Sequence, residues 1–296
     1  MKKQLSQKTI KEIVEQCDVF GFLSVQEFLA HIYNERKKET KPYSYRAFSS
    51  ELGFGESNYM HIICTQRRQL SLRSAHTVAS RLGLHGERRT WFLSLVEHTA
   101  GRDQAQRSGG IEKAYEARRK TLTNELSRDE MEFFGKWYHS VIRELAAHAD
   151  FSSDPKWICQ QLRPRITVEQ AKQSIELQLR LGYLEFNEDL QKIVTLQSHI
   201  RVPEGVTNLA IHKFHQEMLQ LSERSLSEIE AYERDLSAVT LQLNSEHVPA
   251  IKEILRDARK RIVALSETLS GSESAAVFQL NMQLFPVSEF SRGGRK

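Results

Sequence analysis

Short polar side chains and arginines gather in one part of the chain, between residues 46 and 73. Hydroxyl, amide and imidazole groups on a helix can hydrogen-bond to base edges in the DNA major groove. Guanidinium groups beside them can neutralise phosphates. The candidates for base contact are Ser57, Asn58, His61 and Thr65, and those for phosphate contact are Arg46, Arg67, Arg68 and Arg73.

The residues around this set predict a helix, a tight turn and a second short helix. Ser44 suits an N-cap, and Phe48 and Leu52 follow at the spacing of one buried helix face. Gly53 suits the left-handed conformation that ends a helix, and Phe54 then points back to the core. This order is typical of the first half of a helix-turn-helix.

The second helix is expected to begin near Glu56 or Ser57. Its predicted inward residues are Tyr59, Ile62 and Ile63. Two residues depart from the usual motif: Glu56 lies where a phosphate is expected, and Gln66 stands where a glycine is common. A third helix follows, and Gly83 ends it. Its apolar stripe is Leu72, Ala75, Val78, Ala79 and Leu82. The same pattern also fits a small helical bundle with a solvated polar face.

Charge is distributed unevenly along the 296 residues. Residues 1–126 contain 21 Lys and Arg against 14 Asp and Glu, a balance of +7, whereas residues 127–296 contain 21 against 24, a balance of −3. A basic half joined to a mildly acidic half suits a nucleic-acid-binding module with a separate assembly or sensing module. Chance drift of charge along the chain is the alternative interpretation.

The cysteines and the first residues bear on the compartment. The three cysteines, at positions 17, 64 and 159, are far apart and form no CxxC pair, which predicts neither a disulfide framework nor a zinc finger. The first residues contain no uninterrupted apolar run, and no stretch is long and apolar enough to cross a bilayer. We therefore expect a cytoplasmic protein that does not bind membranes.

The N-terminal part is predicted to be one all-helical domain over residues 1–100, with further helices at 6–17 and 21–38. The basic run Arg36-Lys37-Lys38 ends the latter, where it suits either the negative end of the helix dipole or a DNA backbone. Residues 101–126 are polar and contain Gly109-Gly110, so we expect a linker that is partly helical after Ile111.

Residues 127–200 are predicted to form a winged-helix-like domain. Helices over 129–147, 154–162 and 167–181 are followed by two strands around the turn at 187–190. The outward face of the third helix mixes acidic and basic residues, which is poor for binding phosphates. We therefore expect this domain to serve packing or pairing and not to be a second DNA reader.

Residues 201–290 are predicted to form a small α/β assembly or sensing domain, followed by a disordered tail at 291–296. A long helix over 207–231 precedes a strand at 235–244, a helix over 245–269 and a strand within 275–289. The expected fold class is thus mainly α with a smaller α/β part: a repressor-like helical bundle with a helix-turn-helix, a winged-helix-like domain and a small α/β domain.

Five stretches that follow one another along most of the chain carry a family resemblance. They are FLAHIYNERKKETKPYSYRAFSSELGF, RRQLSLRSAHTVASRLGL, KWYHSVIREL, LRPRITVEQAKQSIELQLRLGYLE and VFQLNMQLFPVS. They resemble the Fibrobacter-type paralogous family of bacterial regulators, which is also expanded in predatory bacteria. The resemblance implies an N-terminal repressor-like helix-turn-helix and a C-terminal domain of unassigned function. It implies no particular regulated gene and no effector.

Residues that suggest other chemistry do not form a recognisable site. His212 and His215 lie three residues apart near Glu217, a spacing found in metal sites, but chance pairing among eleven histidines is the simpler interpretation. The sequence contains no GxSxG, P-loop or GxGxxG motif. We therefore expect no enzyme, no metal site and no cofactor.

The sequence favours a transcriptional regulator that binds double-stranded DNA through its helix-turn-helix. One short reading helix covers only a few base pairs, so we expect a homodimer held mainly by residues 127–296. The C-terminal half would pair the subunits. Sensing of an effector is a second role open to it, and the sequence does not identify that effector chemically. The alternative is a protein-interaction module whose helix-turn-helix does not bind DNA.

Overall fold

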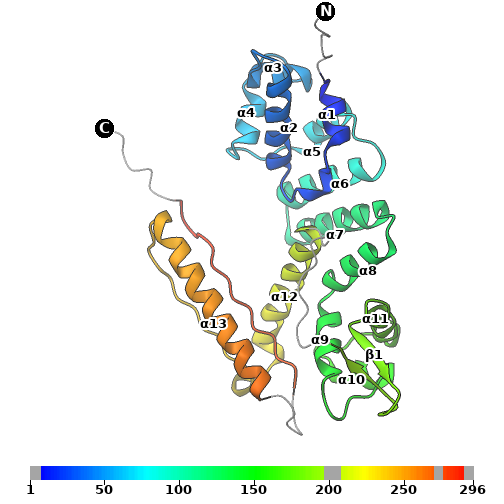
Figure 1. Cartoon of the computed structure of the whole chain (residues 1–296). Helices are drawn as coiled ribbons and strands as arrows, with labels where there is room; N and C mark the ends of the chain where they lie inside the picture. The colour runs from blue at the N-terminus through cyan, green and yellow to red at the C-terminus, as the bar shows by residue number, and fades with distance from the viewer. Residues whose placement is uncertain (1–7, 197–207, 270–275, 290–296) are drawn as a thin grey trace, which may run out of the picture. The chain divides into compact units, whose positions relative to one another are not determined.

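The computed structural model describes residues 8–196, 208–269 and 276–289, and within them the chain is mainly helical with one small sheet (Figure 1). This confirms the predicted class of mainly α structure with a smaller α/β part. The chain divides into two compact units, one of residues 1–137 and 199–215, the other of residues 138–198 and 216–296. No helix in the described ranges combines the length and the apolar character that a bilayer crossing requires.

The first unit packs its helices around one hydrophobic core. The elements are α1 (Ile10–Gln16), η1 (Val19–Gly21), α2 (Val25–Glu39), α3 (Tyr45–Glu51), α4 (Tyr59–Cys64), α5 (Leu72–Arg81), α6 (Gly86–Ala100), α7 (Gln104–Thr121), α8 (Glu125–Phe134) and the beginning of α12 (Asn208–Glu228). Phe28, Trp91 and Phe92 are fully buried in this core. The rings of Phe28 and Trp91 meet edge to face with centroids 5.5 Å apart.

Side-chain caps determine where these helices begin. Thr9 and Glu12 form a capping box at α1. Ser24 accepts a hydrogen bond from the Glu27 amide, so α2 begins at Val25 and not at residue 21 as predicted. Each cap of this kind contributes about 1 kcal/mol to stability. The predicted start of the first helix, at residue 6, lies outside the described residues.

Residues 101–126 do not form the predicted linker, because most of them belong to α7. Ile111, Ala114 and Tyr115 on this helix are buried in the core of the first unit. Gly110 faces α6 so closely that a Cβ there would lie 2.6 Å from the backbone nitrogen of His98. The polar composition was misleading because a narrow stripe of small residues is enough for a helix that packs this tightly.

The helix predicted over 129–147 is two helices, α8 and α9 (Trp137–Leu145), with a break at Gly135. The Tyr115 hydroxyl donates a hydrogen bond to the Met131 carbonyl oxygen over 2.8 Å. A Cβ at Gly135 would overlap that hydroxyl, so only glycine fits where the tyrosine crosses. α8 therefore belongs to the first unit, which extends past the predicted boundary at residue 100.

The second unit begins with the predicted order of three helices and a hairpin. Three helices, α9, α10 (Pro155–Gln161) and α11 (Val168–Arg180), precede a hairpin of β1 (Leu184–Asn187) and β2 (Lys192–Thr195). The strands are antiparallel, with Leu184 opposite Thr195 and Asn187 opposite Lys192. His139 on α9 and Ser174 on α11 are buried, and His139 Nδ1 lies 2.8 Å from Ser174 Oγ. This buried polar pair links the two helices.

The rest of the second unit contains the end of α12, η2 (Ala231–Glu233), η3 (Ser245–His247) and α13 (Val248–Thr268). The segments predicted as strands before and after α13 are extended, but they join no sheet within the described part of one chain, where β1 and β2 form the only sheet. The expected second sheet is therefore not formed there. The predicted tail at 291–296 lies outside the described residues.

Candidate nucleic-acid interface

Helix α3 and the turn after it follow the predicted local order of a capped start, two buried apolar residues and a glycine turn. Ser44 Oγ accepts a hydrogen bond from the Ala47 amide over 3.3 Å. Phe48 and Leu52 are fully buried. Gly53 takes a φ of +87°, the left-handed conformation that closes a helix without steric strain in glycine. This turn directs the chain from α3 towards α4.

Ser49, which the sequence interpretation missed, fixes the start of α4. It is fully buried on α3, and its Oγ accepts a hydrogen bond from the Met60 amide over 3.1 Å. Amides in the first turn of a helix have no acceptor within the helix, so this bond supplies the acceptor that the Met60 amide would otherwise lack. A serine between apolar core positions was the available signal, since a buried hydroxyl requires a partner.

Helix α4 is rotated relative to the prediction. Met60 and Ile63 are its fully buried residues, whereas Tyr59 and Ile62 are partly exposed. The predicted inward position of Ile63 is confirmed, and Tyr59 packs against the core in part, whereas the fully buried position expected for Ile62 belongs to Met60. Tyr59 also packs on Phe54 of the preceding turn, with ring centroids 4.8 Å apart, which leaves the core position to the flexible Met60 side chain.

The four candidates for base contact lie on α4 or next to it, and they differ in how far their side chains are already bonded. Ser57 accepts a hydrogen bond from the Tyr59 amide over 3.4 Å. Thr65 donates to the His61 carbonyl oxygen over 2.7 Å. Asn58 is exposed at the N-cap, and its side chain makes no capping bond. Asn58 therefore keeps a donor and an acceptor available for an external partner.

A row of aromatic rings connects α4 to α2. The His61 ring lies 4.9 Å from that of Tyr45, and Tyr45 stacks on Tyr33 with centroids 3.8 Å apart and planes 11° apart. The Lys37 ammonium lies 5.7 Å from the centre of the Tyr33 ring. These contacts place Lys37 at the end of a packed row that begins at His61. Sequence spacing does not reveal the row, because its members come from three helices.

The three basic residues at the end of α2, Arg36, Lys37 and Lys38, differ in their contacts. Arg36 forms an ion pair with Glu51 over 3.3 Å and is largely buried. Lys38 pairs with Glu35 over 2.5 Å. Lys37 has no carboxylate partner among the described residues, so it is the member of the run best placed to meet a phosphate.

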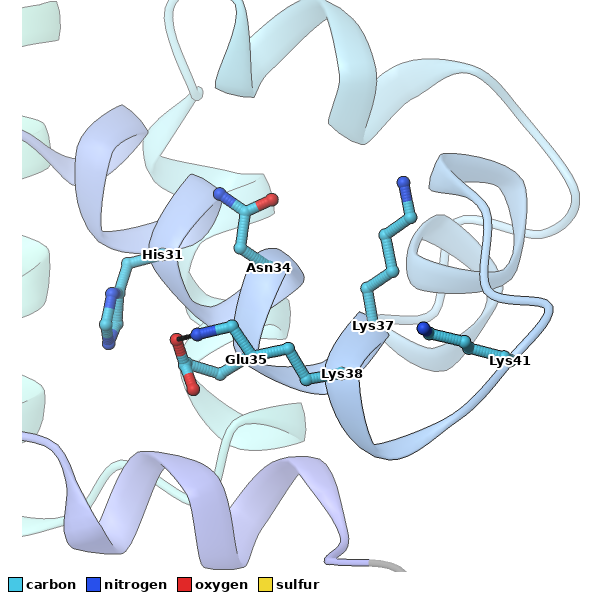
Figure 2. Close-up of a pocket in the computed structure, with 6 residues that line it drawn as sticks. All are labelled: His31, Asn34, Glu35, Lys37, Lys38 and Lys41. Carbon is cyan, nitrogen blue, oxygen red and sulfur yellow. Dashed lines mark hydrogen bonds and ion pairs between the residues drawn. The ribbon is translucent and has the colours of Figure 1, made fainter.

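A shallow hollow of about 610 Å³ lies along this part of α2 (Figure 2). Its lining residues are His31, Asn34, Glu35, Lys37, Lys38 and Lys41. Figure 2 shows Lys38 turned back to Glu35, while Lys37 extends away from that pair. Three ammonium groups against one carboxylate make the hollow cationic.

The four candidate arginines are exposed, and within the described ranges none forms an ion pair: Arg46, Arg67, Arg68 and Arg73. Arg67 and Arg68 directly follow the turn that ends α4. Gln66 occupies this turn with a φ of +60°, so it takes the left-handed conformation that glycine usually supplies. Arg46 is next to Tyr45 of the aromatic row, whereas no contact in the described ranges ties Arg73 to α4.

The paired histidines do not form a metal cluster in the described part of the chain. The His212 ring lies 5.5 Å from that of His98 on α6. Burial lowers the pKa of His212. No group of three or more His, Cys, Asp or Glu side chains suited to a metal ion occurs among the described residues.

Comparison with known proteins bears on the C-terminal part of the chain. A family model described as "Domain of unknown function (DUF4423)" matches residues 117–287. No curated protein and no solved structure matches the chain. The matched segment begins within α7, so helices α2–α5 with the candidate interface lie outside it.

Proposed function

The chain belongs to the DUF4423 family, a domain family of unknown function, and from the α3–α4 surface we propose that it is a sequence-specific, DNA-binding transcriptional regulator. The observation that carries the proposal is the surface of one short helix that is hydrogen-bonded to α3. A side-chain amide without a capping bond lies at its start, and two exposed arginines that form no ion pair among the described residues follow its end. Asn58 supplies the amide, and Arg67 and Arg68 supply the cations. The proposal includes no enzyme activity.

The size and anchoring of α4 suit the major groove. A six-residue helix is about 9 Å long, and the groove, about 12 Å wide, admits an α-helix. The bond from the Met60 amide to Ser49 holds α4 against α3, so little order has to be gained on binding. Asn58 suits bidentate bonding to adenine, and His61 lies one turn further along the same helix.

The surroundings of α4 supply phosphate contacts. Arg46, Arg67 and Arg68 are exposed, and Lys37 lies at the end of the aromatic row that begins at His61. Each phosphate neutralised contributes roughly 0.9 to the slope of log affinity against log salt concentration. Glu56 is exposed in the turn between α3 and α4 and opposes this attraction.

The winged-helix-like part fits a packing role better than a second DNA-reading role. Its third helix, α11, bears Lys172 and Glu176 on its surface with their charged groups 4.0 Å apart. Gln173 donates a hydrogen bond to Glu169 over 2.8 Å on the same helix. Acidic groups interspersed in this way offset the basic ones, so α11 does not offer phosphates a continuous cationic surface.

The test of phosphate binding compares two double variants that remove the same charge. R67A/R68A is expected to weaken binding to all duplexes and to reduce the salt slope by about two, because two phosphate contacts are lost. R165A/K172A, on exposed sites of the winged-helix-like part, is expected to leave both unchanged. Fluorescence anisotropy on labelled duplex over a salt series measures both quantities. An unaltered slope in R67A/R68A excludes these arginines from the interface.

Sequence reading is tested by selecting binding sites from random duplex DNA. Asn58→Ala is expected to relax the selected motif at one or two positions, since a base-edge contact contributes roughly 1–3 kcal/mol. Return of the same motif at the same information content would place the reading surface elsewhere. If the unaltered protein binds no duplex in a salt-dependent manner, the alternative of a protein-interaction module replaces this proposal.

A further inference from the structure

The last part of the second unit carries apolar surface that a single chain leaves uncovered. Extended segments precede and follow α13, at residues 235–244 and 276–287, and appear in Figure 1 without strand arrows. Large apolar side chains on both segments and on α13 are exposed, among them Val239, Leu241, Ile254, Leu265, Phe278 and Leu280. Exposed apolar patches of this extent are characteristic of interaction sites.

The backbone of the two extended segments is also unpaired. Within the described ranges, no backbone-to-backbone hydrogen bond involves residues 236–243 or 276–287, and the Leu280 carbonyl oxygen accepts only from the side chain of its neighbour Gln279. Both segments therefore present strand edges with open donors and acceptors, which are templates for pairing with another chain.

The second segment is held in place as a strand with two different faces. Asn281 donates hydrogen bonds to the Met218 carbonyl oxygen over 3.1 Å and to Ser222 Oγ over 2.7 Å, both on α12. Along the strand, Gln279, Asn281 and Gln283 alternate with the apolar residues at 278, 280, 282 and 284. This period of two is typical of a sheet with one covered face and one polar face.

Neither strand carries the charges that protect natural sheet edges. Residues 236–245 and 276–288 contain no Asp, Glu, Lys or Arg. Monomeric proteins commonly place lysine or other charged residues on exposed edges to prevent pairing. Uncharged strands can also pair with identical strands without like-charge repulsion. The composition therefore favours a second copy of the chain as the occupant.

The uncovered area is sufficient for a stable dimer. Aromatic side chains present roughly 150–250 Å² each, so Phe278 at 78 % exposure and Phe285 at 69 % leave about 300 Å² uncovered. Several large aliphatic side chains of the same segments and of α13 are also more than one-third exposed, among them Leu236, Ile262, Leu269, Leu284 and Val287. Together they reach the scale of a standard interface, about 800 Å² per partner.

We infer that residues 235–269 and 276–289 contribute to a homodimer interface, in which the extended segments at 235–244 and 276–287 pair with those of a second copy to form a shared sheet. About a two-fold axis, a strand that pairs with its own copy is antiparallel to it, so one set of contacts satisfies both chains. The α13 helices supply the apolar cover of this sheet. The inference stands on the second unit alone and is independent of DNA binding.

The experiment measures the mass and the backbone protection of the full chain. Light scattering is expected to give twice the chain mass, and hydrogen exchange is expected to be slow in 236–243 and 277–285. Leu280→Asp and Leu241→Asp are each expected to weaken the dimer about 30-fold or more, as for central interface residues. Their exchange protection in both segments should fall with the dimer. Leu190→Asp is the control, since Leu190 lies in the β1–β2 turn at 59 % exposure against 53 % for Leu280.

Several outcomes overturn the inference. A monomeric full chain does so directly, as does a dimer that both strand variants leave intact. Slow exchange in a monomer would show pairing within the chain, and a stoichiometric complex with a different protein would show another occupant. Far-ultraviolet circular dichroism of each variant checks that helix content is unchanged, and agreement between two variants in separate strands distinguishes loss of the interface from local misfolding.

Discussion

Replacing Gly110 by alanine tests the packing of α7 on α6, and the adjacent Gly109 provides a matched control. Both glycines lie inside α7, where alanine is favoured by about 1 kcal/mol because it restricts the unfolded chain and suits a helix. At Gly109, no heavy atom lies within 4 Å of the place a Cβ would occupy. Gly109→Ala is therefore expected to stabilise the first unit by about 1 kcal/mol.

At Gly110 the same methyl group meets backbone atoms that cannot rotate away. It would lie 2.6 Å from His98 N and 2.6 Å from Ser94 O. Carbon contacts are favourable near 3.5 Å, so α7 has to move by roughly 1 Å relative to α6. Overpacking of this kind costs about 1–3 kcal/mol, and rigid backbone on both sides places this case at the upper end. After the gain in helix propensity, Gly110→Ala is expected to destabilise the unit by about 2 kcal/mol.

The assay is thermal unfolding of the first unit in the full chain. Trp91 is fully buried in this unit, so its fluorescence reports the transition once Trp137 and Trp157 are replaced by phenylalanine in every protein compared. For a unit of this size, 1 kcal/mol shifts Tm by roughly 2–4 °C. Gly110→Ala is expected to lower Tm by about 4–8 °C, and Gly109→Ala to raise it by about 2–4 °C. Equal effects of the two substitutions would refute close packing and return residues 101–126 to the role of a linker.

Two further predictions concern α4 and its turn. Gln66→Gly is expected to raise the stability of the first unit by up to about 1 kcal/mol, as measured by urea unfolding. The reason is that a non-glycine residue in the left-handed conformation costs roughly 1–2 kcal/mol. A clear loss of stability would mean that the glutamine side chain stabilises the turn. Burial raises the pKa of Cys64 to about 12 from 9.0, which lowers its thiolate fraction at pH 8 about a thousandfold. Iodoacetamide labelling followed by mass spectrometry should therefore modify Cys64 rapidly only after unfolding, and rapid labelling of the folded chain would contradict the raised pKa of this partly buried thiol.

Strong local signals explain what could be predicted from the sequence. Ser44, Gly53 and the buried pair Phe48 and Leu52 define α3 and its turn through capping, left-handed geometry and helical spacing, all of which depend on neighbours in the chain. The hairpin of β1 and β2 follows equally local turn and alternation signals. Gln66 was identified in the sequence only as a departure from a position where glycine is common, and its left-handed conformation is a finding of the structure.

The errors arise where distant residues determine the outcome. α7 was interpreted as a linker because Gly109 and Gly110 look flexible, yet Gly110 is required by the backbone of α6. The break at Gly135 depends on Tyr115, twenty residues earlier, and nothing in the local periodicity marks it. The phase of α4 depends on Phe54 drawing Tyr59 onto the turn. For the candidate site, the residue types of α4 were predictable, but the Ser49 anchor and the aromatic row to Lys37 require three-dimensional contacts.

The shortness of α4 gives the two halves of the chain a shared physical rationale. On the proposed function, a single α4 would offer base edges chiefly Asn58 and His61, and at roughly 1–3 kcal/mol per good contact it would fall at the low end of the 4–10 kcal/mol that separates specific from non-specific sites. Lengthening the helix would require a different turn at Gln66, whose backbone ends it. Pairing two copies adds the contacts of a second half-site without any change in α4. The dimer interface that we propose on uncharged strands, in a part of the chain with net negative charge, would supply that second copy without competing for phosphates.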